Sequence, residues 1–245
     1  MHIRRLLLTL VLISAFTLQG LAYGAESKLL KSFLEAYDSN NALGMTAVVE
    51  KNLDKVPGEI KRLIEESQNP KLTKDLRAEK IYIAELLSRE YKNLTDDAAL
   101  LIEVKQVDFN SMLHPPVRPK AKKGIQTITI PTESEKEQNV FKPDNLVIKA
   151  GETVRWTNKD KVVHVFASMP LIGEVGLFSP NIQPGKSWEY KFEKPGVYYY
   201  LCFIHQGMVG KVTVEGEEKD AAKTKGGEKG VKEKKSKNGP EKKEE

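Results

Sequence analysis

Cysteine is almost absent from this chain, because Cys202 is the only one among 245 residues. A single cysteine cannot form an internal disulfide, so the fold must be stabilised without one. Histidine is also scarce, with four residues. Sites that need several imidazole groups are therefore excluded.

The chain also lacks an apolar run long enough to cross a membrane. The run Leu6–Phe16 covers about a dozen residues, whereas a spanning helix needs about 20. Two arginines precede this run, and Ala22–Gly24 is a small-residue cleavage pattern ahead of Ala25. This order is typical of a secretory signal peptide over residues 1–24. We therefore expect an exported, soluble protein of the periplasm or extracellular space, without stable membrane insertion.

Charge of one sign does not dominate either. The sequence has 39 basic and 34 acidic residues, which leaves a formal net charge of +5. This modest excess does not indicate a nucleic-acid partner. Residues 216–245 contain ten lysines and eight acidic residues but almost no large apolar ones, which predicts a disordered Lys/Glu-rich tail. Such a tail is either a solubilising extension or a tether to an anionic partner.

The single cysteine belongs to a short pattern of metal-binding residues. His205 follows Cys202 by three positions, and Met208 follows it by six. A trigonal site of two histidines and one cysteine, with a weak axial methionine, is the blue-copper electron-transfer arrangement. His164 lies in an apolar, strand-like stretch and can supply the second imidazole. A cysteine taken singly can be a small buried apolar residue, but these neighbours predict metal ligation by His164, Cys202, His205 and Met208.

The residues around this pattern resemble a known family, the cupredoxins. Gly185–Cys202 is similar to the last strands of the cupredoxins, His205–Val214 resembles plastocyanin, and Phe141–Asn158 resembles the opening strands. The spacing from cysteine to methionine is similar to that in amicyanin and shorter than in plastocyanin. The resemblance covers roughly residues 124–215. It implies a type 1 blue copper protein that binds one copper ion.

Two positions depart from the family pattern. Val165 follows the upstream histidine where the family usually has asparagine, and Ile204 precedes His205 where many members have proline. Both departures concern the hydrogen bonds around the ligands and leave the ligand set itself intact.

Residues 125–215 also show the hydrophobic period of a β-sheet protein. Turn signals such as Lys149–Gly151 and Lys194–Gly196 separate short segments that alternate between apolar and polar residues. Seven short strands in about 90 residues predict a Greek-key sandwich. The predicted strands are Ile125–Ile130, Asn145–Lys149, Thr153–Asn158, Val162–Ser168, Lys186–Phe192, Gly196–Cys202 and Val209–Val214.

The preceding part of the chain predicts helices. In residues 25–110 apolar residues recur at helical offsets, which indicates a small helical bundle. Thr95 looks like a helix N-cap, because two aspartates follow it. The bundle is either a docking or oligomerisation module or a stable appendage. The fold class is thus α+β and multidomain, with the helical bundle before an all-β Greek-key cupredoxin sandwich.

Residues 111–124 separate the two predicted domains. They contain three prolines and a basic cluster without apolar periodicity, which predicts a Pro/Lys-rich linker. His114 lies before two of these prolines and is expected to be solvated, not a ligand.

These observations predict a copper electron carrier in the periplasm that transforms no substrate and is not an enzyme. The alternative is an exported protein that sequesters or delivers copper without electron transfer. A multicopper enzyme is excluded, because only three histidines remain after residue 24. A dinuclear two-cysteine centre is excluded because Cys202 is alone. We expect redox protein partners to dock on an apolar face around His205, with Leu171 and Ile172 adjoining it.

Overall fold

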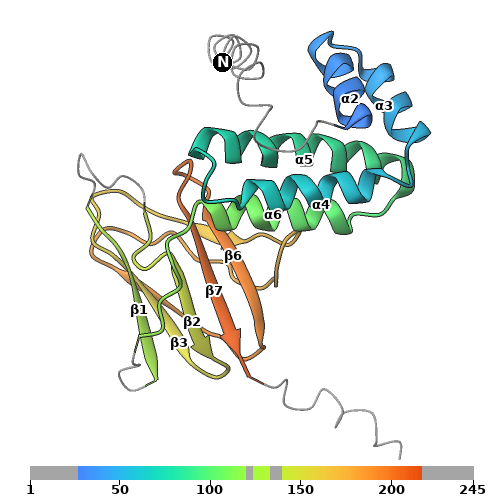
Figure 1. Ribbon diagram of the computed structural model, residues 1–245. Helices are drawn as coiled ribbons and strands as arrows, with labels where there is room; N and C mark the ends of the chain where they lie inside the picture. Colours follow the sequence, from blue (N-terminus) through green and yellow to red (C-terminus); the bar gives the residue numbers. More distant parts are fainter. Residues whose placement is uncertain (1–26, 120–123, 133–139, 217–245) are drawn as a thin grey trace, which may run out of the picture.

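The computed structural model describes residues 27–119, 124–132 and 140–216. In these ranges five helices are followed by seven strands, and the helices lie together at one side of the strands (Figure 1). Among these residues no helix is both long and apolar enough to cross a bilayer. The predicted signal peptide and residues 217–245 of the predicted tail lie outside the described residues.

The five helices share one hydrophobic core. Side-chain oxygens of Ser27, Asn41 and Thr73 accept hydrogen bonds from backbone N–H groups in the first turns of the helices that they precede. These caps satisfy donors that a helix start leaves without an intrahelical partner. The helices are α2 (Lys28–Asp38), α3 (Ala42–Lys51), α4 (Val56–Ser67), α5 (Lys74–Thr95) and α6 (Ala99–Ser111). Their fully buried core residues include Phe33, Val49, Ile60, Leu63, Leu87 and Val104.

The boundary between α5 and α6 differs from the prediction. Thr95 is the last residue of α5, and Asp96 follows in the left-handed conformation with φ of 60°. The hydrogen bond at the start of α6 comes from Asp97, whose Oδ1 accepts from the backbone N of Ala99 at 2.9 Å. The prediction of Thr95 as an N-cap is therefore wrong, because Thr95 still belongs to α5, Asp96 is its C-cap, and the N-cap residue of α6 is Ala98.

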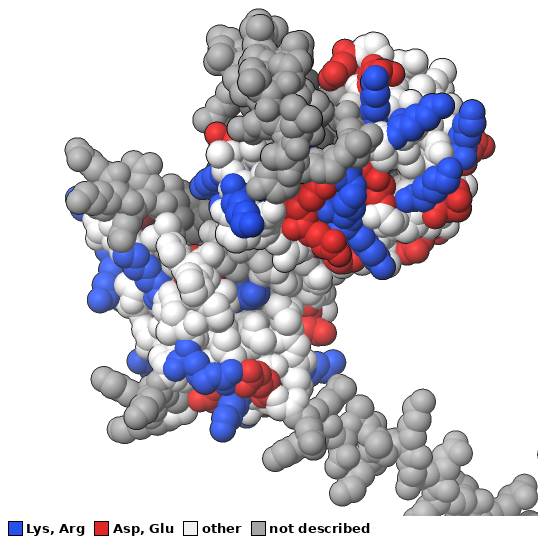
Figure 2. Space-filling model, viewed as in Figure 1, with Lys and Arg blue, Asp and Glu red and all other residues white. Residues whose placement is uncertain are grey.

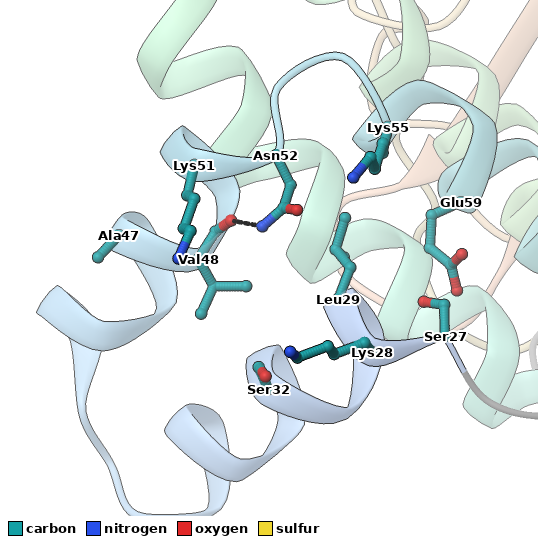
Figure 3. Close-up of a pocket in the computed structure, with 10 residues that line it drawn as sticks. All are labelled: Ser27, Lys28, Leu29, Ser32, Ala47, Val48, Lys51, Asn52, Lys55 and Glu59. Atoms are coloured by element: carbon teal, nitrogen blue, oxygen red, sulfur yellow. Dashed lines mark hydrogen bonds between the residues drawn. The ribbon is translucent and has the colours of Figure 1, made fainter.

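A cleft of about 650 Å³ opens between α2, α3 and the start of α4 (Figure 3). Lys28 and Lys51 extend into the gap between α2 and α3, and Lys55 lies at the start of α4. Asn52 closes one side, with its Nδ2 donating to the carbonyl of Val48 at 2.8 Å. These three lysines form no ion pair with another described residue, but Glu59 lines the same cleft, and basic and acidic side chains are interspersed over the helical region (Figure 2).

The seven strands form two sheets that pack face to face. One sheet has the order β1 (Ile125–Ile130), β3 (Thr153–Asn158), β5 (Ser187–Lys191), and the other has the order β2 (Asn145–Lys149), β7 (Val209–Glu215), β6 (Gly196–Cys202), β4 (Phe166–Ser168). The pairs β1–β3 and β2–β7 are parallel, and the remaining pairs are antiparallel.

Aromatic rings from both sheets fill the space between them. Trp156 of β3 and Tyr200 of β6 are fully buried, and Trp156 Nε1 donates to Tyr200 Oη at 3.3 Å. Phe166 packs against both rings, with centroids 5.2 and 5.4 Å away. A buried indole N–H needs an acceptor, so this contact satisfies the one polar atom of Trp156 while the rest of its ring packs.

Strand β4 is shorter than predicted. It begins at Phe166, because Val162 lies in the turn after β3, where Asn158 Nδ2 donates to the Val162 carbonyl at 2.8 Å. His164 forms only a single bridge, to Ile182 of the β4–β5 connection. Since Phe166 pairs with Cys202, this shorter strand leaves His164 at the same end of the sandwich as Cys202.

Candidate metal centre

The loop between β6 and β7 brings Cys202 and Met208 together. The backbone N of Cys202 donates to the carbonyl of Met208 at 2.9 Å, and the N of Met208 donates to the carbonyl of His205 at 3.3 Å. Gly207 adopts φ of 80° within this turn, a conformation that residues with a Cβ rarely adopt. Both sulfur-bearing residues are buried in the sandwich core, with 4% and 1% of their surface exposed.

The segment that carries His164 lies beside the end of β6, on the side of β6 that is opposite to β7. Its backbone N donates to the carbonyl of Ile182 at 3.2 Å, and the N of Ile182 donates back at 2.8 Å. The backbone N of Phe203 also donates to the carbonyl of Val165 at 2.9 Å. These bonds hold the segment before β4 against the end of β6, and the His164 ring is completely buried.

The distances between the donor atoms fit a single metal ion. Cys202 Sγ lies 3.9 Å from His164 Nδ1 and 3.5 Å from His205 Nδ1. All three donor atoms lie within 4.8 Å of one another. An ion that bonds nitrogen and sulfur at about 2.0–2.3 Å in a trigonal arrangement needs ligand atoms about 3.5–4 Å apart. The described structure therefore brings the three predicted strong donors together at a spacing that suits copper.

The protonation of the cysteine also suits a metal ligand. Burial opposes ionisation of the Cys202 thiol, but hydrogen bonds from His164 and from the backbone N–H groups of residues 165, 204 and 205 outweigh it and lower the pKa to about 6. For His164, burial opposes protonation, but hydrogen bonds to Cys202 and Asp160 raise the pKa above its ordinary value. The thiolate is the form that ligates metals, so Cys202 is prepared for ligation near neutral pH.

Asp160 is a functional residue that the sequence reasoning missed. Its Oδ2 accepts a hydrogen bond from His164 Nε2 at 3.1 Å, and only 5% of its side chain is exposed. This bond directs Nδ1 of His164 toward Cys202. Carboxylates that bind the second ring nitrogen of a metal-ligating histidine fix the ring and raise its basicity. The available signal was the spacing of four residues between an aspartate in a turn and the histidine.

His205 and Met208 differ in exposure. The His205 side chain is partly exposed, and its neighbours Phe203 and Ile204 are 63% and 49% exposed. Met208 is buried in the same core cluster as Cys202. His114, predicted to be solvated, lies outside the cluster of donor atoms and bonds to Asp144 with Nδ1 2.8 Å from Oδ2.

Leu171 and Ile172 do not adjoin this centre as expected. The backbone N of Met169 donates to the carbonyl of Tyr199, and that of Glu174 donates to the carbonyl of Val197. The segment between them therefore runs along β6 away from Cys202. Ile172 is only 2% exposed and packs under α6. Its placement on an exposed apolar face around His205 is wrong, because a helix from the other part of the chain covers it.

Comparison with known proteins identifies relatives of the β region. Residues 128–215 match the family described as copper binding proteins, plastocyanin/azurin family. Amicyanin-alpha of Methylorubrum extorquens is 36% identical over 86 residues, which cover 34% of this chain and 71% of the relative. The plastocyanin of Scenedesmus fuscus is 35% identical over 97 residues, which cover 36% of this chain and 99% of the relative.

Solved structures give similar matches. A purple cupredoxin from Nitrosopumilus maritimus is 39% identical, with coverage of 36% of this chain and 98% of that one, and a TM-score of 0.33. The family match over residues 128–215 includes His164, Cys202, His205 and Met208.

Proposed function

The chain belongs to the plastocyanin/azurin family of copper-binding proteins, and from this premise we propose that it is an exported type 1 blue copper protein that carries single electrons between redox proteins. Its cofactor is copper, and in general terms it is a copper-binding electron carrier. The finer assignment concerns the ligands, the number of ions and the compartment. It rests most directly on the close approach of Cys202 Sγ to the Nδ1 atoms of both histidines.

Each donor has a distinct role in this proposal. Cys202, as a thiolate, and the Nδ1 atoms of His164 and His205 are the three strong ligands of one ion, and Met208 is the weak axial ligand. Bound copper supplies the Cu(I)/Cu(II) couple, for which this ligand set is suited. Asp160 keeps the His164 ring oriented through its bond to Nε2.

The surrounding structure favours electron transfer because it restrains the ligands. Backbone hydrogen bonds join Cys202 to Met208 and Phe203 to Val165, so the ligand loop is tied to itself and to the segment that follows His164. Cys202 and Met208 also pack within the aromatic core. Because the ligands cannot move far, the bond lengths and angles at the ion change little when its charge changes. An electron carrier needs this property.

The proposed function is tested by loading residues 25–245 with copper and recording a visible spectrum and a redox titration. We expect an intense Cu(II)–thiolate charge-transfer band, one copper per chain and a reversible one-electron couple. A protein that binds copper without this band and without a reversible couple would overturn the assignment and favour copper sequestration or delivery.

The compartment of the protein is also part of the proposal. Export to the periplasm or the extracellular space is supported by the basic, apolar and small-residue order of residues 1–24. Fractionation of cells that produce the full chain, with N-terminal sequencing of the product, tests it. A product that retains residue 1 in the cytoplasm contradicts export.

We place the site of electron exchange at the partly exposed edge of His205. The exposed apolar residues Phe203 and Ile204 are the two that precede it in the sequence, while His164 is fully buried. Exposed apolar groups of this kind allow close approach of a partner. The copper-bound protein should therefore exchange electrons through this end of the sandwich.

A matched pair of substitutions tests this placement. Ile204 and Leu171 are equally exposed, at 49% and 50%, but only Ile204 is next to His205. Ile204→Lys should slow electron self-exchange by about tenfold or more at low salt, since two like charges then meet at the contact, while Leu171→Lys should leave the rate nearly unchanged. Stopped-flow or NMR line-broadening measures the rate, and the visible spectrum must stay constant. Equal rates in the two variants contradict the placement.

A further inference from the structure

Helix α6 packs on the outer face of the two strands that carry the ligand loop (Figure 1). Phe109 of α6, Tyr199 of β6 and Ile172 form a buried cluster. The rings of Phe109 and Tyr199 meet edge to face, with centroids 5.0 Å apart and planes at 75°. Val209, the residue directly after Met208, is one of the partly buried residues packed against this cluster. The helical region therefore reaches to within one residue of the proposed axial ligand.

Asn110 of α6 connects β6 to β7 at a defined position. Tyr199 and Lys211 are direct cross-strand partners. Asn110 Nδ2 donates to Tyr199 Oη at 3.2 Å, and Lys211 Nζ donates to Asn110 Oδ1 at 2.7 Å. The Lys211 Nζ atom also lies 5.8 Å from the centroid of the Tyr199 ring. One side chain of α6 thus bonds to both members of a pair that spans the two strands.

A third contact holds the segment beside β6. Gln106 Nε2 donates to the carbonyl of Ile172 at 2.8 Å, in the segment that hydrogen-bonds to β6 through Met169 and Glu174. Gln106, Phe109 and Asn110 lie on one face of α6, because residues three and four apart are neighbours on a helix. The other side of the helix, including Val104, packs in the helical core.

This contact is close to the proposed ligands along both strands. Tyr199 is three residues before Cys202, and Lys211 is three residues after Met208. At a rise of about 3.3 Å per residue the contact lies about 10 Å from each ligand. A change in the distance between β6 and β7 at this pair therefore also changes the distance between the two ends of the six-residue loop that connects Cys202 to Val209.

We propose that Phe109 and Asn110 are positioning residues for the copper centre: by holding β6 against β7 they fix the relative positions of Cys202 and Met208. The helical region then sets the axial interaction, and with it the reduction potential, of a centre to which it contributes no ligand. The inference rests on the proposed function. It predicts that loosening α6 from the sheet opens the ligand loop before it unfolds the sandwich.

The test compares variants on the two sides of α6. Phe109→Ala removes the ring that packs on Tyr199, and Asn110→Leu removes both hydrogen bonds at similar volume. Tyr199→Phe removes a single hydroxyl and serves if a larger change prevents folding. Val104→Ala is the matched control, because Val104 is fully buried on the same helix but packs only within the helical core.

The first measurement uses the full chain without copper. Cys202 is the only thiol and is 4% exposed, so its alkylation by iodoacetamide at a fixed pH reports opening of the loop. Phe109→Ala and Asn110→Leu should accelerate alkylation by about twofold to thirtyfold, the range expected when a coupling network is weakened. Phe109→Ala should have the larger effect, since it loses a buried contact. Val104→Ala should leave the rate unchanged even though it lowers the melting temperature.

The second measurement uses the same variants loaded with copper. The copper hyperfine splitting and the reduction potential should shift in Phe109→Ala and Asn110→Leu and stay constant in Val104→Ala. Unchanged alkylation and potential in both α6 variants, or equal changes in the control, would overturn the proposal. Because alkylation needs no copper, faster alkylation in a protein that forms no blue centre would sink the proposed function alone.

Discussion

Cys202→Ala is expected to abolish the blue chromophore while the β region stays folded. The charge-transfer band of a type 1 centre requires a thiolate on Cu(II), and Cys202 is the only thiol in the chain. Its side chain is small, so losing the sulfur from the core costs only about 1 kcal/mol of unfolding free energy. The visible spectrum after copper loading reports the chromophore, and near-UV circular dichroism, to which the buried Trp156 and Tyr200 contribute, reports the fold.

Met208→Leu is the control for this substitution. Met208 is 1% exposed in the core, and a volume-conserving change there costs less than about 1.5 kcal/mol, whereas alanine would leave a cavity. Because an axial thioether tunes the metal more than it holds it, this variant should keep copper and colour but shift the reduction potential. Loss of copper from Met208→Leu together with retained colour in Cys202→Ala contradicts the ligand assignment.

Asp160→Ala is expected to weaken copper binding by about tenfold to a hundredfold, the usual effect of removing a hydrogen-bond partner from a metal-ligating histidine. Asp160 binds Nε2 of the fully buried His164 at 3.1 Å, and no other carboxylate is found at that nitrogen among the described residues. Without it the ring can rotate and its Nδ1 atom is no longer directed at Cys202. Competition with a chelator of known affinity measures the loss.

Asp160→Asn separates the charge of the carboxylate from its geometry. The amide oxygen can still accept from His164 Nε2, so copper affinity should fall less than in the alanine variant. The negative charge is lost, however, and it stabilises the more positive oxidised ion. The reduction potential should therefore rise, by about 59 mV for each tenfold loss in Cu(II) over Cu(I) affinity. Equal affinity in wild type and Asp160→Ala would show that the bond does not orient the ligand.

The sequence by itself predicted the proposed donor set and determined the class of the β region. Cys202, His205 and Met208 lie within seven consecutive residues, so their proximity depends only on a short loop between two strands. Period-two patterning located six of the seven strands closely, because alternation reports which face of each strand is buried. His164 could be assigned to the same ligand set because the chain has few histidines and the residues around it are typical of a strand.

The tertiary structure decided what depends on contacts between distant segments. The hydrogen bond that Asp160 accepts from His164 forms only because β4 starts late and leaves a turn around His164. The burial of Ile172 depends on α6, about 65 residues earlier in the chain, where an apolar residue gives no sign of what will cover it. The period of a segment shows that one face is apolar but not which partner covers that face. For this reason the link between the helical region and the ligand loop became visible only in the folded molecule.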